Sequence, residues 1–300
     1  MSAIEIRNVT KYYGKSRGVE DLSLSVAEGD IFGFIGPNGA GKSTTIRILL
    51  NFIFPDSGSA AILGRDVVRE AAAIRKSVGY MPSEVHFYGD RKISELLEYS
   101  RSFYGSCGRQ RMNMLTDMLD LDVSRKFENL SFGNKKKVSI VQAFMHSPSI
   151  VILDEPTTGL DPLVQQTFFK LLLEEHGKGT TIFFSSHTLS EVQKLCKNVG
   201  IIRNGGMVNV EEIETLRKKH LRRVFLESRG PVDCKSLEGE DISDLSCNGN
   251  TAEFYYKGEI NSLISRLGSM DLRDFSMREP ELEEIFMHYY SREGSDDIET

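Results

Sequence analysis

The sequence predicts an α/β protein with a mainly parallel sheet, followed by a small α+β domain. Two apolar runs, residues 31–35 and 150–153, have the length and continuity of strands that are buried on both faces. A third such run covers residues 181–186, and segments of helical periodicity alternate with these runs. The chain has 300 residues, of which 40% are hydrophobic, so it can bury a substantial core.

A glycine-rich segment follows the first apolar run: residues 36–43 read Gly-Pro-Asn-Gly-Ala-Gly-Lys-Ser. This is the spacing of a phosphate-binding loop, whose glycines let successive backbone N–H groups surround a phosphate. Residues 44–50 carry apolar side chains at helical spacing, and a helix here adds the positive end of its dipole. The sequence therefore predicts a nucleoside triphosphate with magnesium as ligand. The expected contacts are Gly36, Pro37, Asn38, Gly39, Ala40, Gly41, Lys42, Ser43 and Thr44.

Residue type assigns chemical roles in this loop and at a later strand end. Lys42 can reach the β- and γ-phosphates, and Ser43 can ligate Mg²⁺. The apolar run at residues 150–153 ends in Asp154 and Glu155, so a parallel strand delivers two adjacent carboxylates to one edge of the sheet. We expect Asp154 to hold the metal and Glu155 to act as the general base toward the attacking water.

Three further segments complete a pattern with the loop and the carboxylates. Residues 130–134 read Leu-Ser-Phe-Gly-Asn, residues 156–161 read Pro-Thr-Thr-Gly-Leu-Asp, and His187 follows the run at residues 181–186. In this order the motifs resemble the nucleotide-binding subunit of ATP-binding cassette (ABC) transporters, a family with the P-loop NTPase fold. The resemblance spans residues 4 to about 210. It implies an ATP-hydrolysing subunit that powers a separate integral membrane permease.

The resemblance also implies nucleotide contacts outside the loop. Tyr13 matches the aromatic residue that stacks on adenine, and Tyr12 is the alternative. Ser131 and Gly133 match the family signature, in which a helix N-terminus points at the γ-phosphate of the nucleotide held by a second subunit. The active form is therefore expected to be a dimer, most simply a homodimer, with ATP at the interface.

Two residues near the catalytic centre complete the implied site. His187 matches the switch histidine, whose imidazole donates to the γ-phosphate. Asp161 matches the residue that shapes the dimer contact beside the catalytic centre. Asp161 followed by Pro162 is also a strong helix N-cap pattern, and the two roles are compatible.

The chain departs from the family pattern at two places. Phe132 stands in the signature where the family usually has a small residue or lysine. Ser83 stands where the family usually has a glutamine that reaches the metal and the water, and Glu84 follows it. Serine is too short for that reach. Either a water fills the gap, or Glu84 substitutes for the glutamine with a shifted backbone.

The chain is expected to divide into two domains. Residues 1–214 form the nucleotide-binding domain, and residues 92–148, with helical periodicity, resemble the inserted helical subdomain that presents the signature and contacts the membrane partner. Residues 222–290 read as a small α+β domain that ends in a helix beginning near residue 279. This domain is similar to the C-terminal extension of the drug-, antibiotic- and ion-exporter branch of the family. Residues 291–300 are expected to be disordered.

Composition restricts location and partners. Mean hydropathy is −0.27 and no apolar run approaches the ~18 residues that span a bilayer, so we expect a cytoplasmic protein held at the inner face of the membrane by its permease. The net charge of −6 argues against nucleic acid as a partner. We expect the four cysteines to be reduced thiols. Two basic runs, residues 135–137 and 217–223, are expected to be solvated helix faces, although the second could contact anionic lipid or nucleic acid.

Two alternative functions fit the sequence less well. A soluble regulatory ATPase of the same family, acting on ribosomes or DNA, generally has two cassettes in one chain or long coiled-coil insertions. This chain has one phosphate-binding loop, one signature and no heptads. A kinase or GTPase would leave the signature unexplained, and residues 134–137 lack the aspartate that reads guanine.

Overall fold

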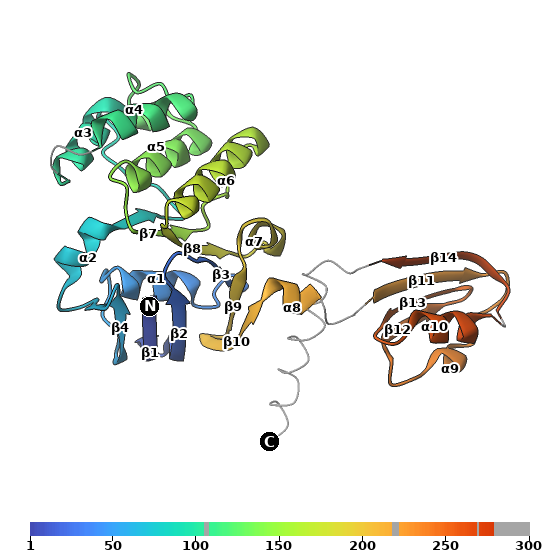
Figure 1. Ribbon diagram of the computed structural model, residues 1–300. Helices are drawn as coiled ribbons and strands as arrows, with labels where there is room; N and C mark the ends of the chain where they lie inside the picture. Colours follow the sequence, from blue (N-terminus) through green and yellow to red (C-terminus); the bar gives the residue numbers. More distant parts are fainter. Residues whose placement is uncertain (105–107, 218–221, 269, 279–300) are drawn as a thin grey trace. The chain divides into compact units, whose positions relative to one another are not determined.

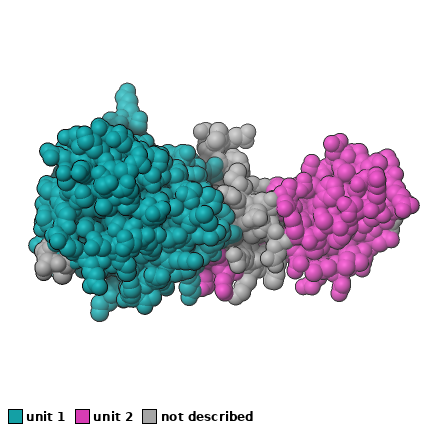
Figure 2. Space-filling view, turned by 90° about the horizontal axis from the view of Figure 1, so that it is seen from above, with its two compact units in different colours: residues 1–211 teal, residues 212–300 magenta. Residues whose placement is uncertain are grey.

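The computed structural model describes residues 1–104, 108–217, 222–268 and 270–278. The chain forms two compact units, residues 1–211 and 212–300, which Figure 2 shows in different colours. Within the described residues, no helix is both long enough and apolar enough to cross a membrane. The helix expected from residue 279 and the tail at residues 291–300 lie outside the described residues.

The central sheet of the first unit has six strands and is mainly parallel, as the sequence predicts (Figure 1). In spatial order the strands are β10 (Gly206–Glu212), β9 (Asn198–Arg203), β3 (Ile31–Ile35), β8 (Thr181–Ser186), β7 (Ile150–Asp154) and β6 (Val78–Met81). Every residue of β3, β7 and β8 is buried, which explains why these strands are continuous apolar runs. Because the three strands are parallel neighbours, their carboxyl ends meet at one edge of the sheet.

A second, antiparallel sheet of four strands completes the first unit. Its order is β2 (Ser16–Ala27), β1 (Ser2–Tyr13), β4 (Ser57–Ile62) and β5 (Arg65–Asp66). The alternation of Leu22, Leu24 and Val26 predicts β2, and all three side chains are buried. The sequence does not predict β1, because Asn8 has a left-handed backbone (φ 47°) and the pairing register shifts between Ile6 and Val9. That irregularity interrupts the two-residue alternation of a regular strand.

Helix α1 (Lys42–Leu49) joins the two sheets. It contacts β2 and β4 of the antiparallel sheet and β7 of the parallel one. Its buried side chains Ile46, Ile48 and Leu49 share a core cluster with Phe34 and Phe183 of the central sheet. Each such burial contributes about 1.5–3 kcal/mol, so the packing firmly fixes the helix whose N-terminus follows the phosphate-binding loop.

The helical subdomain packs beside this core. Helices α3 (Ile93–Ser102), α4 (Arg109–Met118) and α5 (Phe132–Phe144) contact one another, and α5 also contacts β6. Leu96, Leu97 and Leu115, which carry the helical periodicity of the sequence, are buried. Other helices among the described residues are α2 (Ala71–Ser77), the 3-10 helix η1 (Phe127–Asn129), α6 (Pro162–Gly177), α7 (Leu189–Leu195) and α8 (Ile213–Arg217).

The described part of the second unit contains α8, an antiparallel sheet and two further helices. The strand order is β12 (Ile242–Asn248), β13 (Thr251–Tyr256), β11 (Arg222–Ser228) and β14 (Leu272–Arg278), with α9 (Cys234–Leu237) and α10 (Ile260–Leu267). Leu263 and Leu267 of α10 belong to the buried core of this unit. Cys234 and Cys247 form a disulfide, so the prediction of reduced thiols is wrong for this pair. The two lie 13 residues apart and come together only because α9 packs on β12.

Candidate active site

The phosphate-binding loop links the end of β3 to the start of α1. Gly39 and Gly41 have left-handed backbones, with φ of 80° and 111°, which glycine adopts without strain. Helix α1 has no side-chain N-cap and no acidic residue in its first turn. Its first backbone N–H groups and the positive end of its dipole therefore remain available to an anion.

Lys42 lies inside this loop. Its side chain is only 5% exposed, and Nζ donates to the carbonyl oxygens of Gly36 (2.7 Å) and Pro37 (3.1 Å). Nζ also lies 3.5 Å from Oε1 of Glu155. Burial lowers the pKa of the Lys42 ammonium, while Glu155 and Asp154 act in the opposite direction. The loop thus holds a cation beside free helix amides, which fits the binding of phosphate.

A pocket of about 210 Å³ lies over the loop and gathers many of the predicted site residues. Gly36, Pro37 and Ala40 belong to the loop but do not line this pocket. The lining residues that the sequence predicts are Tyr13, Asn38, Gly39, Gly41, Lys42, Ser43, Thr44 and Glu155.

The pocket is also lined by two residues that the sequence does not predict, Arg17 and Gly18. A Cβ on Gly18 would lie 2.9 Å from both the Tyr13 ring and a backbone oxygen, so only glycine fits beside this ring. The hydroxyl of Tyr12 instead donates to Glu20 (2.7 Å). Of the two tyrosines considered, Tyr13 is therefore the one placed at the pocket.

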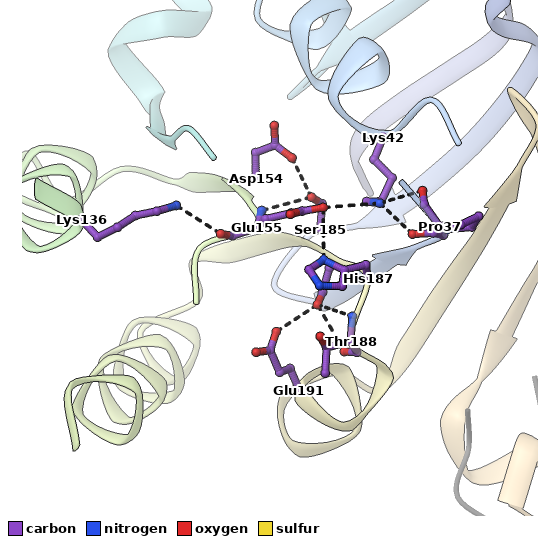
Figure 3. Close-up of polar contacts among 11 residues, drawn as sticks. Pro37, Lys42, Lys136, Asp154, Glu155, Ser185, His187, Thr188 and Glu191 are labelled. Carbon is purple, nitrogen blue, oxygen red and sulfur yellow. Dashed lines mark hydrogen bonds and ion pairs between the residues drawn. The ribbon is translucent and has the colours of Figure 1, made fainter. Parts of the chain in front are cut away.

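Glu155 lies at the carboxyl edge of the sheet, directly after β7. Its Oε1 is 3.3 Å from Nδ1 of His187, which follows β8, and 3.5 Å from Nζ of Lys42 (Figure 3). Its backbone is left-handed (φ 46°), and its N–H donates to the carbonyl oxygen (3.2 Å) and to Oγ (3.3 Å) of Ser185. The fold thus brings together three residues that are far apart in the sequence.

Asp154, the last residue of β7, is 3% exposed and accepts a hydrogen bond from Ser185 Oγ (2.9 Å). In Figure 3 its second carboxylate oxygen points away from Ser185. Its carboxylate and the hydroxyl of Ser43 are hard oxygen donors of the kind that Mg²⁺ prefers. Among the described residues, no group of three or more His, Cys, Asp or Glu side chains could hold a metal by itself. Asp154 and Ser43 therefore suit an ion whose other ligands are water molecules and phosphate oxygens.

Lys136 contradicts the prediction that residues 135–137 form a solvated face. It is 0% exposed, and its Nζ donates to the carbonyl oxygens of Pro82 and Glu155, both at 3.2 Å. The buried residues Ile140 and Phe144 follow at intervals of four along α5. Val138, Val141 and Ala143 are buried as well, so α5 is covered on several sides and the basic run does not mark a solvated face.

The burial of Lys136 predicts a pH dependence of stability. Burial lowers its pKa from 10.5 to about 8, against the opposite effect of Asp154, Glu155 and Glu84. Between these two pH values the unfolded chain holds a proton that the folded chain has lost, so stability rises with pH across this window. We expect wild type to gain on the order of 3 kcal/mol relative to Lys136→Met between pH 8 and 10.5. Urea unfolding of both proteins at several pH values measures this gain in the free energy of unfolding. A difference between the two proteins that stays constant with pH would contradict the prediction.

The signature residues occupy the start of α5. Ser131 is the N-cap, and its Oγ accepts from the backbone N–H of Asn134 (3.4 Å). The Phe132 ring lies against Gly159, where an added Cβ would be 2.2 Å from it. Ser131 and Gly133 do not line the pocket over their own phosphate-binding loop. Within the described part of the chain, they are thus apart from the predicted nucleotide contacts that line this pocket.

Asp161 is the N-cap of α6, whose first residue is Pro162. Its Oδ1 accepts from the backbone N–H groups of Leu163 (3.1 Å) and Val164 (3.0 Å). The predicted cap is confirmed. Like the signature, Asp161 does not line the pocket over the loop of its own chain.

The segment after β6 contains the two candidates for the missing glutamine. The side chain of Glu84 is 79% exposed and lies 3.3 Å from Nε2 of His86. Ser83 is half-buried. The side chain of Glu84 therefore faces solvent, and Lys136 links the Pro82 carbonyl of this segment to the Glu155 carbonyl.

Comparison with known proteins shows the family to which the chain belongs. The sequence profile of the ABC transporter family matches residues 19–158. The bacitracin transport ATP-binding protein BcrA of Bacillus licheniformis is 31% identical and aligns over 95% of this chain and 96% of its own length. The Nod factor export ATP-binding protein I of Rhizobium etli is 30% identical and aligns over 98% of this chain and 95% of its own length.

Solved structures confirm the P-loop NTPase fold. The ATP-binding subunit of an ABC transporter, 29% identical, superimposes with a TM-score of 0.69 over 73% of this chain and 93% of its own. A dimeric ATP-binding cassette in a post-hydrolysis state with ADP and phosphate shares the fold, with a TM-score of 0.63 and 21% identity. The superposition covers 70% of this chain and 98% of that cassette. The chain therefore belongs to the family of ABC transporter ATP-binding proteins, and it is an ATPase of that family.

Proposed function

We propose that this protein is the ATP-hydrolysing subunit of a multi-subunit ABC exporter, held at the inner face of the cell membrane by a separate permease. The observation that carries the proposal is the position of Glu155, whose carboxylate lies between Lys42 and His187 at the edge of the phosphate pocket. The transport and export proteins that align over nearly the whole chain favour an exporter over a regulatory ATPase acting on ribosomes or DNA.

The loop and the pocket suit one ATP. Lys42 and the first amides of α1 would hold the phosphates, and the half-exposed ring of Tyr13 would stack on adenine. Ser43 and Asp154 would hold Mg²⁺, which neutralises charge on the phosphates when it is bound. Lys42 now contacts two loop carbonyls and Glu155, and phosphate oxygens are stronger acceptors for the same ammonium.

Hydrolysis would use the residues at the ends of β7 and β8. Glu155 would orient the attacking water and accept its proton. His187, 3.3 Å from Glu155, would donate to the γ-phosphate, which leaves the Glu155 carboxylate free to face the water. Among the side chains that line the pocket over the loop, Glu155 is the one carboxylate.

The separation of the signature from the loop favours a dimer. Ser131 and Gly133 lie outside the pocket of their own chain, so they would reach the γ-phosphate bound to a second, identical subunit. Asp161, in the neighbouring loop, would lie at the same interface. Each site would then be complete only when two subunits close, which would make hydrolysis a timer of the transport cycle.

A groove of about 470 Å³, lined by α2, the segment after β6 and the helical subdomain, is the proposed docking site of the permease. It is lined by aromatic side chains of α3 and of the segment after β6, among them Phe87, Tyr88, Tyr99 and Phe103. Tyr99 and Phe103 are more than 60% exposed although their rings contact each other at 5.1 Å between centroids. Exposed aromatic clusters of this kind mark protein interfaces.

This surface gives a direct prediction. The double change Tyr99→Ser and Phe103→Ser should abolish copurification of a polytopic membrane protein. ATP hydrolysis by the isolated subunit should stay within about twofold of wild type, because changes at exposed positions usually alter stability little. Leu173→Ser, at an exposed apolar position of α6, is the matched control. Unchanged recovery of the membrane protein with the double variant would exclude the groove as its docking site.

Affinity purification from detergent-solubilised membranes tests the proposed function as a whole. We expect the tagged protein to retain a stoichiometric polytopic membrane protein that mass spectrometry identifies. Recovery only from the soluble fraction, alone or with ribosomes, would instead support the regulatory ATPase. Purified protein without ATP hydrolysis in either fraction would contradict both functions.

A further inference from the structure

Glu155 has a backbone conformation that needs support. A left-handed φ of 46° at a residue other than glycine costs about 1–3 kcal/mol and persists only where neighbouring groups hold it. Ser185 holds the N–H side of Glu155 through its carbonyl and its hydroxyl. Lys136 holds the other side, because its Nζ donates to the carbonyl oxygen of Glu155 at 3.2 Å. Both peptide groups that set the direction of the Glu155 side chain are therefore fixed.

The same ammonium reaches a third segment. Lys136 lies on α5, five residues after the N-cap Ser131, and it also donates to the carbonyl oxygen of Pro82 at 3.2 Å. Pro82 begins the segment that continues to Phe87 and Tyr88 in the aromatic groove. Figure 3 shows Lys136 extending from α5 to the backbone of Glu155. One side chain thus joins the signature helix, the segment after β6 and the peptide of Glu155.

Stability alone accounts poorly for a cation at this position. Lys136 is 0% exposed, and its two hydrogen-bond partners are neutral carbonyl oxygens. Burial disfavours the charged form and lowers the pKa of Lys136, although Asp154, Glu155 and Glu84 act in the opposite direction. What methionine cannot do at this position is donate to two carbonyl groups from different segments.

We propose that Lys136 is a positioning residue for ATP hydrolysis, which fixes the Glu155 carbonyl and thereby the direction of the Glu155 carboxylate. Through Pro82 it also makes that direction depend on the placement of the segment that lines the aromatic groove. This is a link that the short side chain of Ser83 cannot provide. The proposal rests on the proposed role of Glu155 as general base.

Three variants test it by steady-state ATP hydrolysis and ATP titration of the purified full chain. Lys136→Met should lower kcat at least ~10-fold, the effect of a base misplaced by about 1 Å or less, with KM for ATP and nucleotide affinity within about twofold of wild type. Lys136→Arg, which keeps a charged donor, should recover most of the lost kcat. Lys137→Met, the same change at the next and half-exposed position, should behave as wild type.

A matched double variant shows whether Lys136 acts through Glu155. Lys136→Met should not lower the residual turnover of Glu155→Gln any further, because a group that acts through another has nothing left to position. A purely structural role would lower the two rates independently.

The remaining outcomes overturn the proposal. One is normal turnover in Lys136→Met. Another is a Lys136→Met protein that unfolds, or that loses ATP affinity as much as it loses turnover. The third is a Lys136→Arg protein with a kcat no higher than that of Lys136→Met. Normal turnover in Glu155→Gln would instead contradict the proposed function of the site. Full activity in Lys136→Met beside an inactive Glu155→Gln would remove only the role of Lys136.

Discussion

Glu155→Gln should retain ATP binding and lower hydrolysis at least ~10²-fold, the usual contribution of a general base. Glutamine has nearly the same size and still accepts a hydrogen bond, so the contacts to His187 and Lys42 can persist in weaker form. It cannot accept the proton of the attacking water. Phosphate release and ATP titration measure the two effects separately. Because bound ATP is no longer consumed, a sizing column with ATP should also show a stabilised dimer.

Glu174→Gln is the matched control for this change. Glu174 is exposed on α6 and does not line the pocket, so hydrolysis should equal that of wild type. A Glu155→Gln protein that remains monomeric with ATP and hydrolyses it normally would remove Glu155 from the catalytic role. A loss of ATP affinity equal to the loss of turnover would assign it to binding instead.

Lys42→Ala should weaken ATP binding at least ~10-fold, because a charge-assisted hydrogen bond to phosphate contributes about 1.5–3 kcal/mol. The buried ammonium is held inside the loop by the carbonyl oxygens of Gly36 and Pro37. Titration with a fluorescent ATP analogue measures the affinity, and circular dichroism establishes that the variant is folded.

Lys170→Ala removes a lysine from an exposed position of α6 and should leave the affinity unchanged. Normal affinity in Lys42→Ala would mean that residues 36–43 do not hold the phosphates. Equal weakening in both variants would indicate a general electrostatic effect of net charge rather than a contact in the loop.

The sequence predicts those parts of the site that depend on local pattern. The buried parallel strands β3, β7 and β8 are continuous apolar runs because both of their faces are covered. The loop and the carboxylates lie at the ends of these runs, so their approximate places follow from chain order alone. The caps at Ser131 and Asp161 are equally local, since each depends on the side chain and the next three backbone amides.

The parts that the sequence does not predict depend on contacts between distant segments. Arg17 and Gly18 reach the pocket only because β1 and β2 pair and bring them beside Tyr13, and the backbone irregularity at Asn8 hides β1 from pattern analysis. Lys136 is one of three consecutive lysines, and charge gives no sign of which of them is buried. The helical period does not distinguish it either, because buried apolar residues also follow Lys137 at intervals of four, at Val141 and Met145.

On the proposed role of Glu155 as general base, its left-handed backbone sets folding and catalysis against each other at one position. Glycine or asparagine would adopt this backbone with less strain, and neither can serve as a base. A chain that keeps glutamate here accepts lower stability to retain turnover. Copies of this gene released from selection for ATP hydrolysis should therefore drift toward glycine or asparagine at position 155, and the residue found there would report whether a relative still hydrolyses ATP.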